Sequence, residues 1–304
     1  MHFTVLAALV ALLLPLDTAS SGSRLTPETT HLRAARSGGP AAQAAALGRL
    51  REDSVQSAAL GKEMKYRVLV PEGYDSSLER YPVLYLLHGL GGNYADWTTR
   101  SNVAEYSRTL PLIIVMPDGG NQWYTNADDG SARVEDYMTT DLPADVVKKY
   151  RTINSRYGRA IAGLSMGGYG ALKLALKRPA AFSVVGSFSG ALEAARDGAF
   201  ERLIGAAEAK RMEAIFGPAG GKTRLENDVF ALASRMKPGA APYIYIDCGI
   251  ADNELIASNR EIVGALHTAG VPYEYHEVPG AHTWDYWDRR IREFLPLLMK
   301  RLAN

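Results

Sequence analysis

The sequence predicts an α/β protein with a mostly parallel sheet, helices on both faces and an antiparallel hairpin at its N-terminal edge. From about residue 48, short and continuously apolar runs alternate with helical patterns. Strands that are apolar throughout are typical of a parallel sheet covered on both faces. Two strand-like segments joined at Gly61-Lys62 precede this alternation, which makes the sheet mixed. No pattern repeats with a period of about 20–50 residues, so a solenoid is excluded.

The elements are expected in a simple order along the chain. The hairpin occupies residues 49–60 and 64–71. The later strands are expected at 83–88, 112–116, 158–164, 182–188, 242–248 and 273–278, and the helices at 93–110, 134–150, 167–178, 253–268 and 286–302. A helical insertion at about 191–240, including 200–216, is either a cap above the carboxyl ends of the strands or an additional packing layer.

The N-terminal segment is typical of an export signal. Its first sixteen residues are almost wholly apolar and are followed by small residues, a run too short to cross a bilayer. No Lys or Arg precedes the run, so an uncleaved anchor and a buried helix are also considered. We expect a signal peptide at 1–20, a flexible lead-in at 21–47 and a single domain at 48–304. The mature protein is then secreted or periplasmic, without stable membrane insertion.

The composition narrows the possible partners. The chain has 304 residues, of which 47% are apolar and 22% charged, and its formal net charge is +1. This balance gives no reason to expect a nucleic acid as partner. The only cysteine, Cys248, excludes an intramolecular disulfide and is expected to be a core residue. The sequence does not indicate an oligomeric state.

No cofactor or metal is expected. Residues 217–223 resemble a phosphate-binding loop but are one residue short of that motif and follow a helical segment. Residues 89–92 follow a strand, but Tyr94 stands where a dinucleotide-binding loop needs its third glycine. The six histidines are scattered, and no Cys/His cluster exists.

Gly163-Leu164-Ser165-Met166-Gly167 is the most informative motif. A predicted strand precedes it and a predicted helix follows it. A serine on a tight strand-to-helix turn is held out above the sheet, where its hydroxyl can attack a carbonyl. Side chains two residues to either side would collide, which explains the glycines. Ser165 is therefore the candidate nucleophile.

A serine nucleophile needs a base, and the base needs an acid that orients it. His282 follows the last strand, in a loop at the same sheet edge as Ser165, and is the preferred base; His276 and His88 are the second choices. Asp252 follows the penultimate strand and is the preferred acid. Asp247 is the second choice, and Asp118 and Asp285 are less well placed.

The oxyanion that forms during acyl transfer needs backbone donors that already point at it. The N–H of Met166, at the start of the helix, is one candidate. The second is expected from the glycine-rich loop after the first core strand, and Leu90 is the candidate there.

With these residues in place, the chain resembles the esterase D-like branch of the α/β-hydrolases, the "putative esterase" family. Six segments carry the resemblance, which spans about residues 50–300: Val70-Pro71-Glu72-Gly73-Tyr74, Tyr85-Leu86-Leu87-His88-Gly89, Met116-Pro117-Asp118-Gly119, Gly163 to Gly168, Asp247-Cys248-Gly249 with Asp252, and Gly280-Ala281-His282-Thr283-Trp284. The resemblance implies an α/β-hydrolase fold and a triad of Ser165, Asp252 and His282. It also implies that Trp123 and Tyr124 belong to a substrate-facing loop segment; surface aromatic residues that pack the cap are an equal alternative. Trp284 and Trp287 follow His282 at helical spacing and are expected in the core.

The expected activity is that of an exported serine carboxylesterase that hydrolyses short-chain acyl, carbohydrate or aryl esters through an acyl-enzyme. Three further activities remain open. The same acyl-enzyme could pass its acyl group to a sugar or lipid alcohol, as mycolyltransferases do, or come from a thioester, as in S-formylglutathione hydrolases. The third possibility is a binding protein without catalysis.

Overall fold

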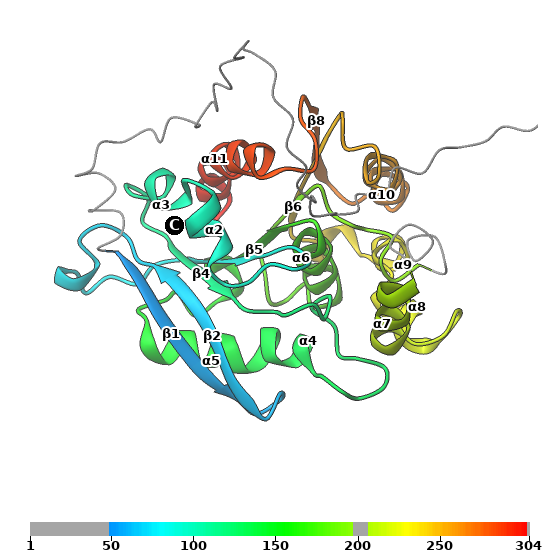
Figure 1. The fold of residues 1–304 in the computed structure, drawn as a ribbon. Coiled ribbons are helices and arrows are strands. Elements are labelled where there is room, and N and C mark those ends of the chain that lie inside the picture. The colour runs from blue at the N-terminus through cyan, green and yellow to red at the C-terminus, as the bar shows by residue number, and fades with distance from the viewer. Residues whose placement is uncertain (1–48, 197–205, 303–304) are drawn as a thin grey trace, which may run out of the picture. The chain divides into compact units, whose positions relative to one another are not determined.

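The computed structural model describes residues 49–196 and 206–302. Its centre is an eight-stranded sheet in the order β1-β2-β4-β3-β5-β6-β7-β8 (Figure 1). The strands are β1 (Leu50–Ser57), β2 (Lys62–Leu69), β3 (Val83–Leu87), β4 (Ile113–Pro117), β5 (Arg159–Leu164), β6 (Val184–Phe188), β7 (Tyr243–Gly249) and β8 (Tyr273–Val278). β2 runs antiparallel to both β1 and β4, and all other pairs are parallel. The predicted mixed sheet with an N-terminal hairpin is confirmed.

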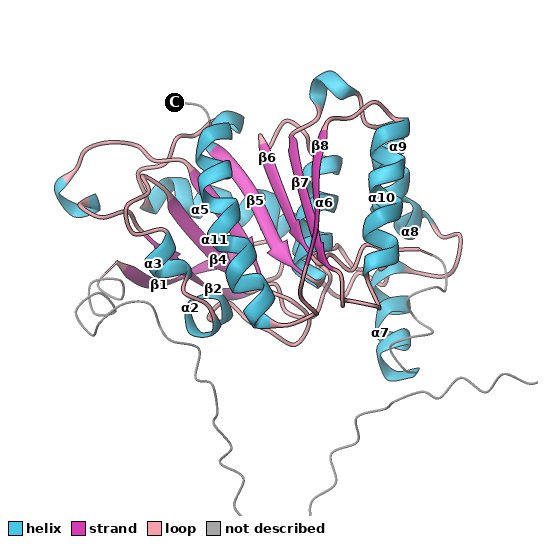
Figure 2. Ribbon diagram, turned by 90° about the horizontal axis from the view of Figure 1, so that it is seen from above, coloured by secondary structure: helices cyan, strands magenta, loops and turns pink. Residues whose placement is uncertain are grey.

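Two layers of helices cover the sheet because both of its faces are apolar (Figure 2). Along β3, Leu84 and Leu86 point to one hydrophobic cluster, and Val83, Tyr85 and Leu87 point to the other. The first cluster includes side chains of α2 (Asp96–Arg100), α3 (Val103–Tyr106) and α11 (Trp284–Arg301). The second includes side chains of α5 (Leu142–Lys149), α6 (Met166–Lys177), α9 (Val229–Arg235) and α10 (Ile256–Thr268). The remaining α-helices are α4 (Val134–Asp136), α7 (Ala206–Phe216) and α8 (Lys222–Asn227).

The prediction of a single helix at 93–110 is wrong. The structure breaks it into α2 and α3, with Ser101 in an extended conformation between them. The carboxylate of Asp288 on α11 accepts hydrogen bonds from the backbone N–H of Asn102, at 2.6 Å, and from its side-chain amide. A contact with a residue far along the chain therefore ends the helix, and local sequence could not indicate it.

The insertion predicted at about 191–240 contains α7, α8 and α9. α9 packs against α6 and α10, so this helix extends the helical layer beside the sheet. Residues 197–205, part of the same prediction, lie outside the described residues. The prediction that the insertion caps a pocket stays a prediction.

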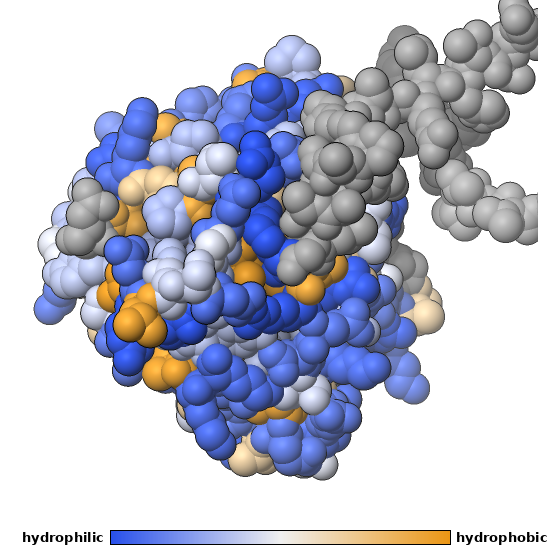
Figure 3. Space-filling model, turned by 90° about the vertical axis from the view of Figure 1, so that its left-hand side faces the viewer, coloured by the Kyte–Doolittle hydropathy of each residue, from blue (hydrophilic) through white to orange (hydrophobic). Residues whose placement is uncertain are grey.

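The hairpin edge of the sheet is polar. β1 carries Arg51, Glu52 and Asp53, and charged side chains on an edge strand discourage pairing with another chain. The side of the molecule shown in Figure 3 is accordingly mostly hydrophilic, with scattered hydrophobic spots.

The predicted signal peptide and lead-in, residues 1–47, lie outside the described residues. Within the described ranges, none of the helices combines the length and the apolar character that a membrane span needs.

A buried ion pair holds α6 against α4, and a hydrogen bond holds it against the segment before α4. Lys173 is fully buried, and its ammonium donates to the carboxylate of Glu135, at 2.9 Å, and to the carbonyl of Tyr124, at 2.6 Å. Lys177 also donates to Glu135, at 2.9 Å. Burial alone would raise the pKa of Glu135, but the two ammonium groups outweigh burial and hold this pKa at about 2.

This pair gives a pH-dependent contribution to stability. The pKa of Glu135 is depressed in the folded chain, so the unfolded chain binds its proton first as the pH falls. We expect the full contribution of Glu135 to the free energy of unfolding above pH 4.5. As the pH falls from 4.5 to about 2, the free energy of unfolding should decrease by up to about 3 kcal/mol. Urea unfolding at several pH values measures it. A Glu135→Gln/Lys173→Met double variant should lose less stability over the same range, and an equal loss in both proteins would contradict the assignment.

Candidate active site

Ser165 occupies a strained turn between β5 and α6. Its backbone φ is 53° and ψ is −119°, a conformation that residues other than glycine rarely adopt. The turn is too tight for side chains at its flanks: a Cβ at Gly163 would lie 2.5 Å from the carbonyl oxygen of Gly167, and one at Gly167 would lie 2.6 Å from that of His88. The glycine spacing in the sequence thus has the steric cause expected of it.

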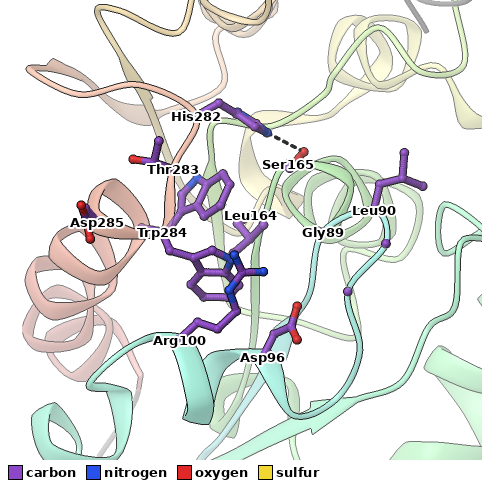
Figure 4. Close-up of a pocket in the computed structure, with 13 residues that line it drawn as sticks. Gly89, Leu90, Asp96, Arg100, Leu164, Ser165, His282, Thr283, Trp284 and Asp285 are labelled. Atoms are coloured by element: carbon purple, nitrogen blue, oxygen red, sulfur yellow. Dashed lines mark hydrogen bonds between the residues drawn. The ribbon is translucent and has the colours of Figure 1, made fainter. Parts of the chain in front are cut away.

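His282 and Asp252 lie in line behind the Ser165 hydroxyl. The Nε2 atom of His282 is 2.9 Å from the Ser165 Oγ, the contact drawn as a dashed line in Figure 4. Its Nδ1 atom is 2.8 Å from the Asp252 Oδ2. Asp252 is buried, whereas the imidazole is about one-third exposed. Three residues from separate loops at the carboxyl edge of the sheet therefore form one hydrogen-bonded chain.

The two predicted oxyanion donors lie beside this chain. Met166 is the first residue of α6, and its N–H has no acceptor within its own helix. Leu90 is the second residue of a turn closed by a hydrogen bond from the Gly92 N–H to the Gly89 carbonyl, at 3.1 Å. That hydrogen bond does not use the Leu90 N–H. The Asn121 side chain fixes the same turn by accepting from the Gly91 N–H at 2.8 Å.

His88 supports this loop and is not placed to act as a base. It is buried, its Nδ1 is 2.8 Å from the Gly89 carbonyl, and its Nε2 accepts from the Gly119 N–H at 3.0 Å. Burial lowers the pKa of its imidazole, so the neutral form that both hydrogen bonds need is favoured. His88 thereby ties the loop after β3 to the loop after β4.

The second-choice base His276 and the second-choice acid Asp247 both bind partners outside the hydrogen-bonded chain. His276, on β8, has its Nε2 2.7 Å from the carboxylate of Glu274. Asp247 is fully buried on β7 and accepts from Tyr286 and Arg290 instead of His282. Burial raises the pKa of Asp247 to about 6, although Arg290 and Tyr286 both lower it. Asp118, a weaker candidate for the acid, accepts from a backbone N–H in its own loop.

The expectation that Trp123 and Tyr124 face the substrate is not supported. Both side chains are buried, with exposed fractions of 1% and 0%. The Trp123 ring packs against Phe216, and the Tyr124 hydroxyl donates to the His88 carbonyl at 2.9 Å. Tyr124 therefore lies behind the oxyanion loop. Cys248 is buried as expected, and burial raises the pKa of its thiol to about 12.

Beyond Leu90, Ser165 and His282, the residues that line the site were not predicted from the sequence. A pocket of about 460 Å³ opens beside Ser165 between the oxyanion loop, α2 and the start of α11 (Figure 4). Trp287, which is buried in the core as expected, and Trp284, which packs against the core, both also line the pocket. The Trp287 ring meets the His282 imidazole edge to face, with centroids 4.8 Å apart. The helical spacing indicates their core role, and the structure adds that they form part of the pocket wall.

Charged groups from α2 complete the pocket. Asp96 and Arg100 both line it, and the Arg100 guanidinium lies 4.9 Å from the centroid of the Trp284 ring. Figure 4 shows both side chains below Ser165. Among the described residues, no hydrogen bond or ion pair satisfies the Arg100 guanidinium.

A mostly parallel sheet with a serine on a strained strand-to-helix turn, bonded to a histidine and a buried carboxylate, defines an α/β-hydrolase of the serine type. The comparisons narrow this class. Residues 57–298 match the family model described as "Putative esterase". The chain belongs to this family and is a carboxylic ester hydrolase.

Individual relatives agree with this membership. The chain is 30% identical over 225 residues to an acetyl esterase of Caldicellulosiruptor saccharolyticus, covering 71% of this chain and 83% of that enzyme. It is 32% identical over 253 residues to esterase Rv1288 of Mycobacterium tuberculosis, where the match covers 75% of this chain but only 54% of that longer protein. Its fold resembles the substrate-bound fluorophosphonate-binding serine hydrolase F of Staphylococcus aureus, with a TM-score of 0.73, 25% identity, and coverage of 82% of this chain and 98% of that one.

Proposed function

We propose that the chain hydrolyses short-chain acyl esters through an acyl-enzyme formed on Ser165. The observation that carries this proposal is the continuous chain of hydrogen bonds from Ser165 through His282 to Asp252. His282 accepts the hydroxyl proton as the Ser165 Oγ attacks the ester carbonyl, and Asp252 stabilises the imidazolium that forms. The N–H groups of Leu90 and Met166 stabilise the negative charge on the carbonyl oxygen.

The tetrahedral intermediate then collapses. The bond to the alcohol oxygen breaks, His282 gives its proton to that oxygen, and the acyl group stays on Ser165. Water, deprotonated by His282, attacks the acyl-enzyme, releases the acid and restores the Ser165 hydroxyl.

The pocket beside His282 suits the alcohol half of the substrate. The leaving oxygen must come within hydrogen-bond reach of the His282 Nε2, since His282 protonates it. Trp284 and Trp287 continue the wall that begins at His282. Arg100, which lies over the Trp284 ring, and Asp96 offer donors and acceptors in the same pocket, which favours an alcohol that carries hydroxyl groups, such as a sugar. The acetyl esterase relative supports a short acyl group.

A panel of esters tests the proposed function. We expect the purified protein to hydrolyse p-nitrophenyl acetate and acetylated sugars, and comparison with longer aliphatic and feruloyl esters defines its acyl preference. Absence of hydrolysis across the panel would refute the proposal. Addition of an alcohol acceptor separates hydrolysis from acyl transfer, because a transferase would form new ester faster than free acid.

Arg100 gives a prediction about the alcohol. We expect Arg100→Ala to raise the KM for an acetylated sugar about tenfold, because a hydrogen bond from a charged donor is lost. The KM for p-nitrophenyl acetate should change little, since its leaving group, p-nitrophenol, has no hydroxyl group besides the esterified one. Arg292→Ala is the matched control: Arg292 also lies over an aromatic ring, that of Tyr106, but does not line the pocket. Equal KM changes in both variants, or none in Arg100→Ala, would contradict the placement.

We further propose that residues 1–20 are a signal peptide and that the enzyme acts outside the cytoplasm on ester substrates, with residues 48–304 as its catalytic domain. The apolar N-terminal run supports this. N-terminal sequencing of the mature protein from an expressing bacterium tests it. A mature protein that keeps Met1 in the cytoplasm would refute it.

A further inference from the structure

A second carboxylate, Asp247, lies beneath the active site and takes no part in the proposed triad. It is fully buried on β7 and contacts two residues of α11. Its Oδ1 accepts from the Tyr286 hydroxyl at 2.8 Å, and its Oδ2 accepts from the Arg290 Nε at 3.1 Å. The Arg290 guanidinium in turn donates to the Tyr245 hydroxyl at 2.9 Å. The buried charge is thus paired and fixes the first turns of α11 to the sheet.

Tyr286 connects this cluster to the loop that carries His282. Its ring lies so close to Gly280 that a Cβ there would collide with the ring. Gly280 also touches Gly249, where a Cβ would collide with the Gly280 carbonyl oxygen. That carbonyl also accepts from the Ala251 N–H at 2.9 Å, one residue before Asp252. Gly280 is therefore clamped between Tyr286 and the loop of Asp252, two residues before His282.

The chemistry of the Asp247 cluster indicates that it fixes the positions of neighbouring groups more than it raises the stability of the fold. A buried ion pair is often no more stabilising than apolar side chains of the same volume, because both charges lose their hydration. The hydrogen bond to the fixed Asp247 carboxylate instead holds the Tyr286 ring in a single orientation. A misplacement of a catalytic group by about 1 Å can cost up to about 100-fold in rate.

We infer that Asp247 is a positioning residue for His282: by holding the Tyr286 hydroxyl it fixes the ring against which Gly280 packs, and with it the loop that places the imidazole between Ser165 and Asp252. Two carboxylates, one on β7 and one in the loop after it, then serve one histidine. Asp252 orients the imidazole directly, and Asp247 orients the loop that carries His282. This inference rests on the proposed function of His282.

Two conservative variants test the inference. Tyr286→Phe removes only the hydroxyl that reaches Asp247. Tyr245→Phe is the matched control, because it removes a hydroxyl of the same buried cluster from a ring that does not support Gly280. For p-nitrophenyl acetate we expect Tyr286→Phe to lower kcat about tenfold with KM unchanged, and Tyr245→Phe to stay within about twofold of the wild type.

A proton NMR measurement provides the second readout, independent of turnover. We expect the downfield signal of the His282 Nδ1 proton to shift or broaden in Tyr286→Phe and to persist in Tyr245→Phe. Melting temperatures show whether the two variants are comparably folded. Wild-type kcat and an unchanged imidazole signal in Tyr286→Phe would overturn the inference, as would equal losses of kcat in both variants. If the wild-type protein hydrolyses no ester, the proposed function fails, while the imidazole signal still tests the positioning by Asp247.

Discussion

Ser165→Ala should lower kcat for p-nitrophenyl acetate by about 10⁴- to 10⁶-fold. The substitution removes the only atom that can form the acyl bond in the proposed mechanism. The remaining rate would come from the oxyanion donors and from binding. Steady-state kinetics on the purified variant measure this loss.

The fold should survive this substitution. Ser165 already adopts a strained φ of 53°, which alanine tolerates no better and no worse, and within the described part of the chain its side chain makes only the hydrogen bond to His282. Circular dichroism and thermal unfolding should therefore match the wild type. A folded variant that retains wild-type hydrolysis would remove Ser165 from the mechanism.

Asp252→Asn should lower kcat by about 10³- to 10⁴-fold with little change in KM. An amide can donate to the His282 Nδ1 and so favour the tautomer whose Nε2 carries a proton, which cannot accept the Ser165 proton. Kinetics on p-nitrophenyl acetate across pH 5–9 (roughly the range in which histidine titrates) measure the effect.

Glu254→Gln is the control for this substitution. Glu254 lies two residues further along the same loop and is exposed. Its kcat should equal that of the wild type. A small loss in Asp252→Asn, no larger than that of Glu254→Gln, would contradict the role of Asp252.

The fold and the chain of three site residues could be predicted because their signals are local. Continuously apolar strands indicate a parallel sheet, and Gly163 reflects a collision within five residues, although the collision at Gly167 involves the distant His88 carbonyl. His282 and Asp252 could be chosen because loops after parallel strands meet at one edge of the sheet. The structure brings these three residues within hydrogen-bond distance.

The pocket could not be predicted, because its walls come from contacts between distant segments. Trp123 and Tyr124 stand in a loop after a strand, as substrate-facing residues often do, yet their rings fill the space behind α6 and the oxyanion loop. Trp284 has the spacing of a core residue, yet its ring also contacts the Arg100 guanidinium at the pocket. The position of Arg100 depends in turn on the break between α2 and α3, which Asp288 on α11 stabilises.

The central claim is that Ser165 is the residue that becomes acylated, and covalent labelling tests it most directly. Wild-type protein, incubated with a fluorophosphonate probe and digested, should carry the label on the peptide that contains Ser165. The Asp252→Asn variant should be labelled far more slowly, and Ser165→Ala should not be labelled at all. A label on any other residue, or an active wild-type enzyme that the probe neither labels nor inhibits, would contradict the account.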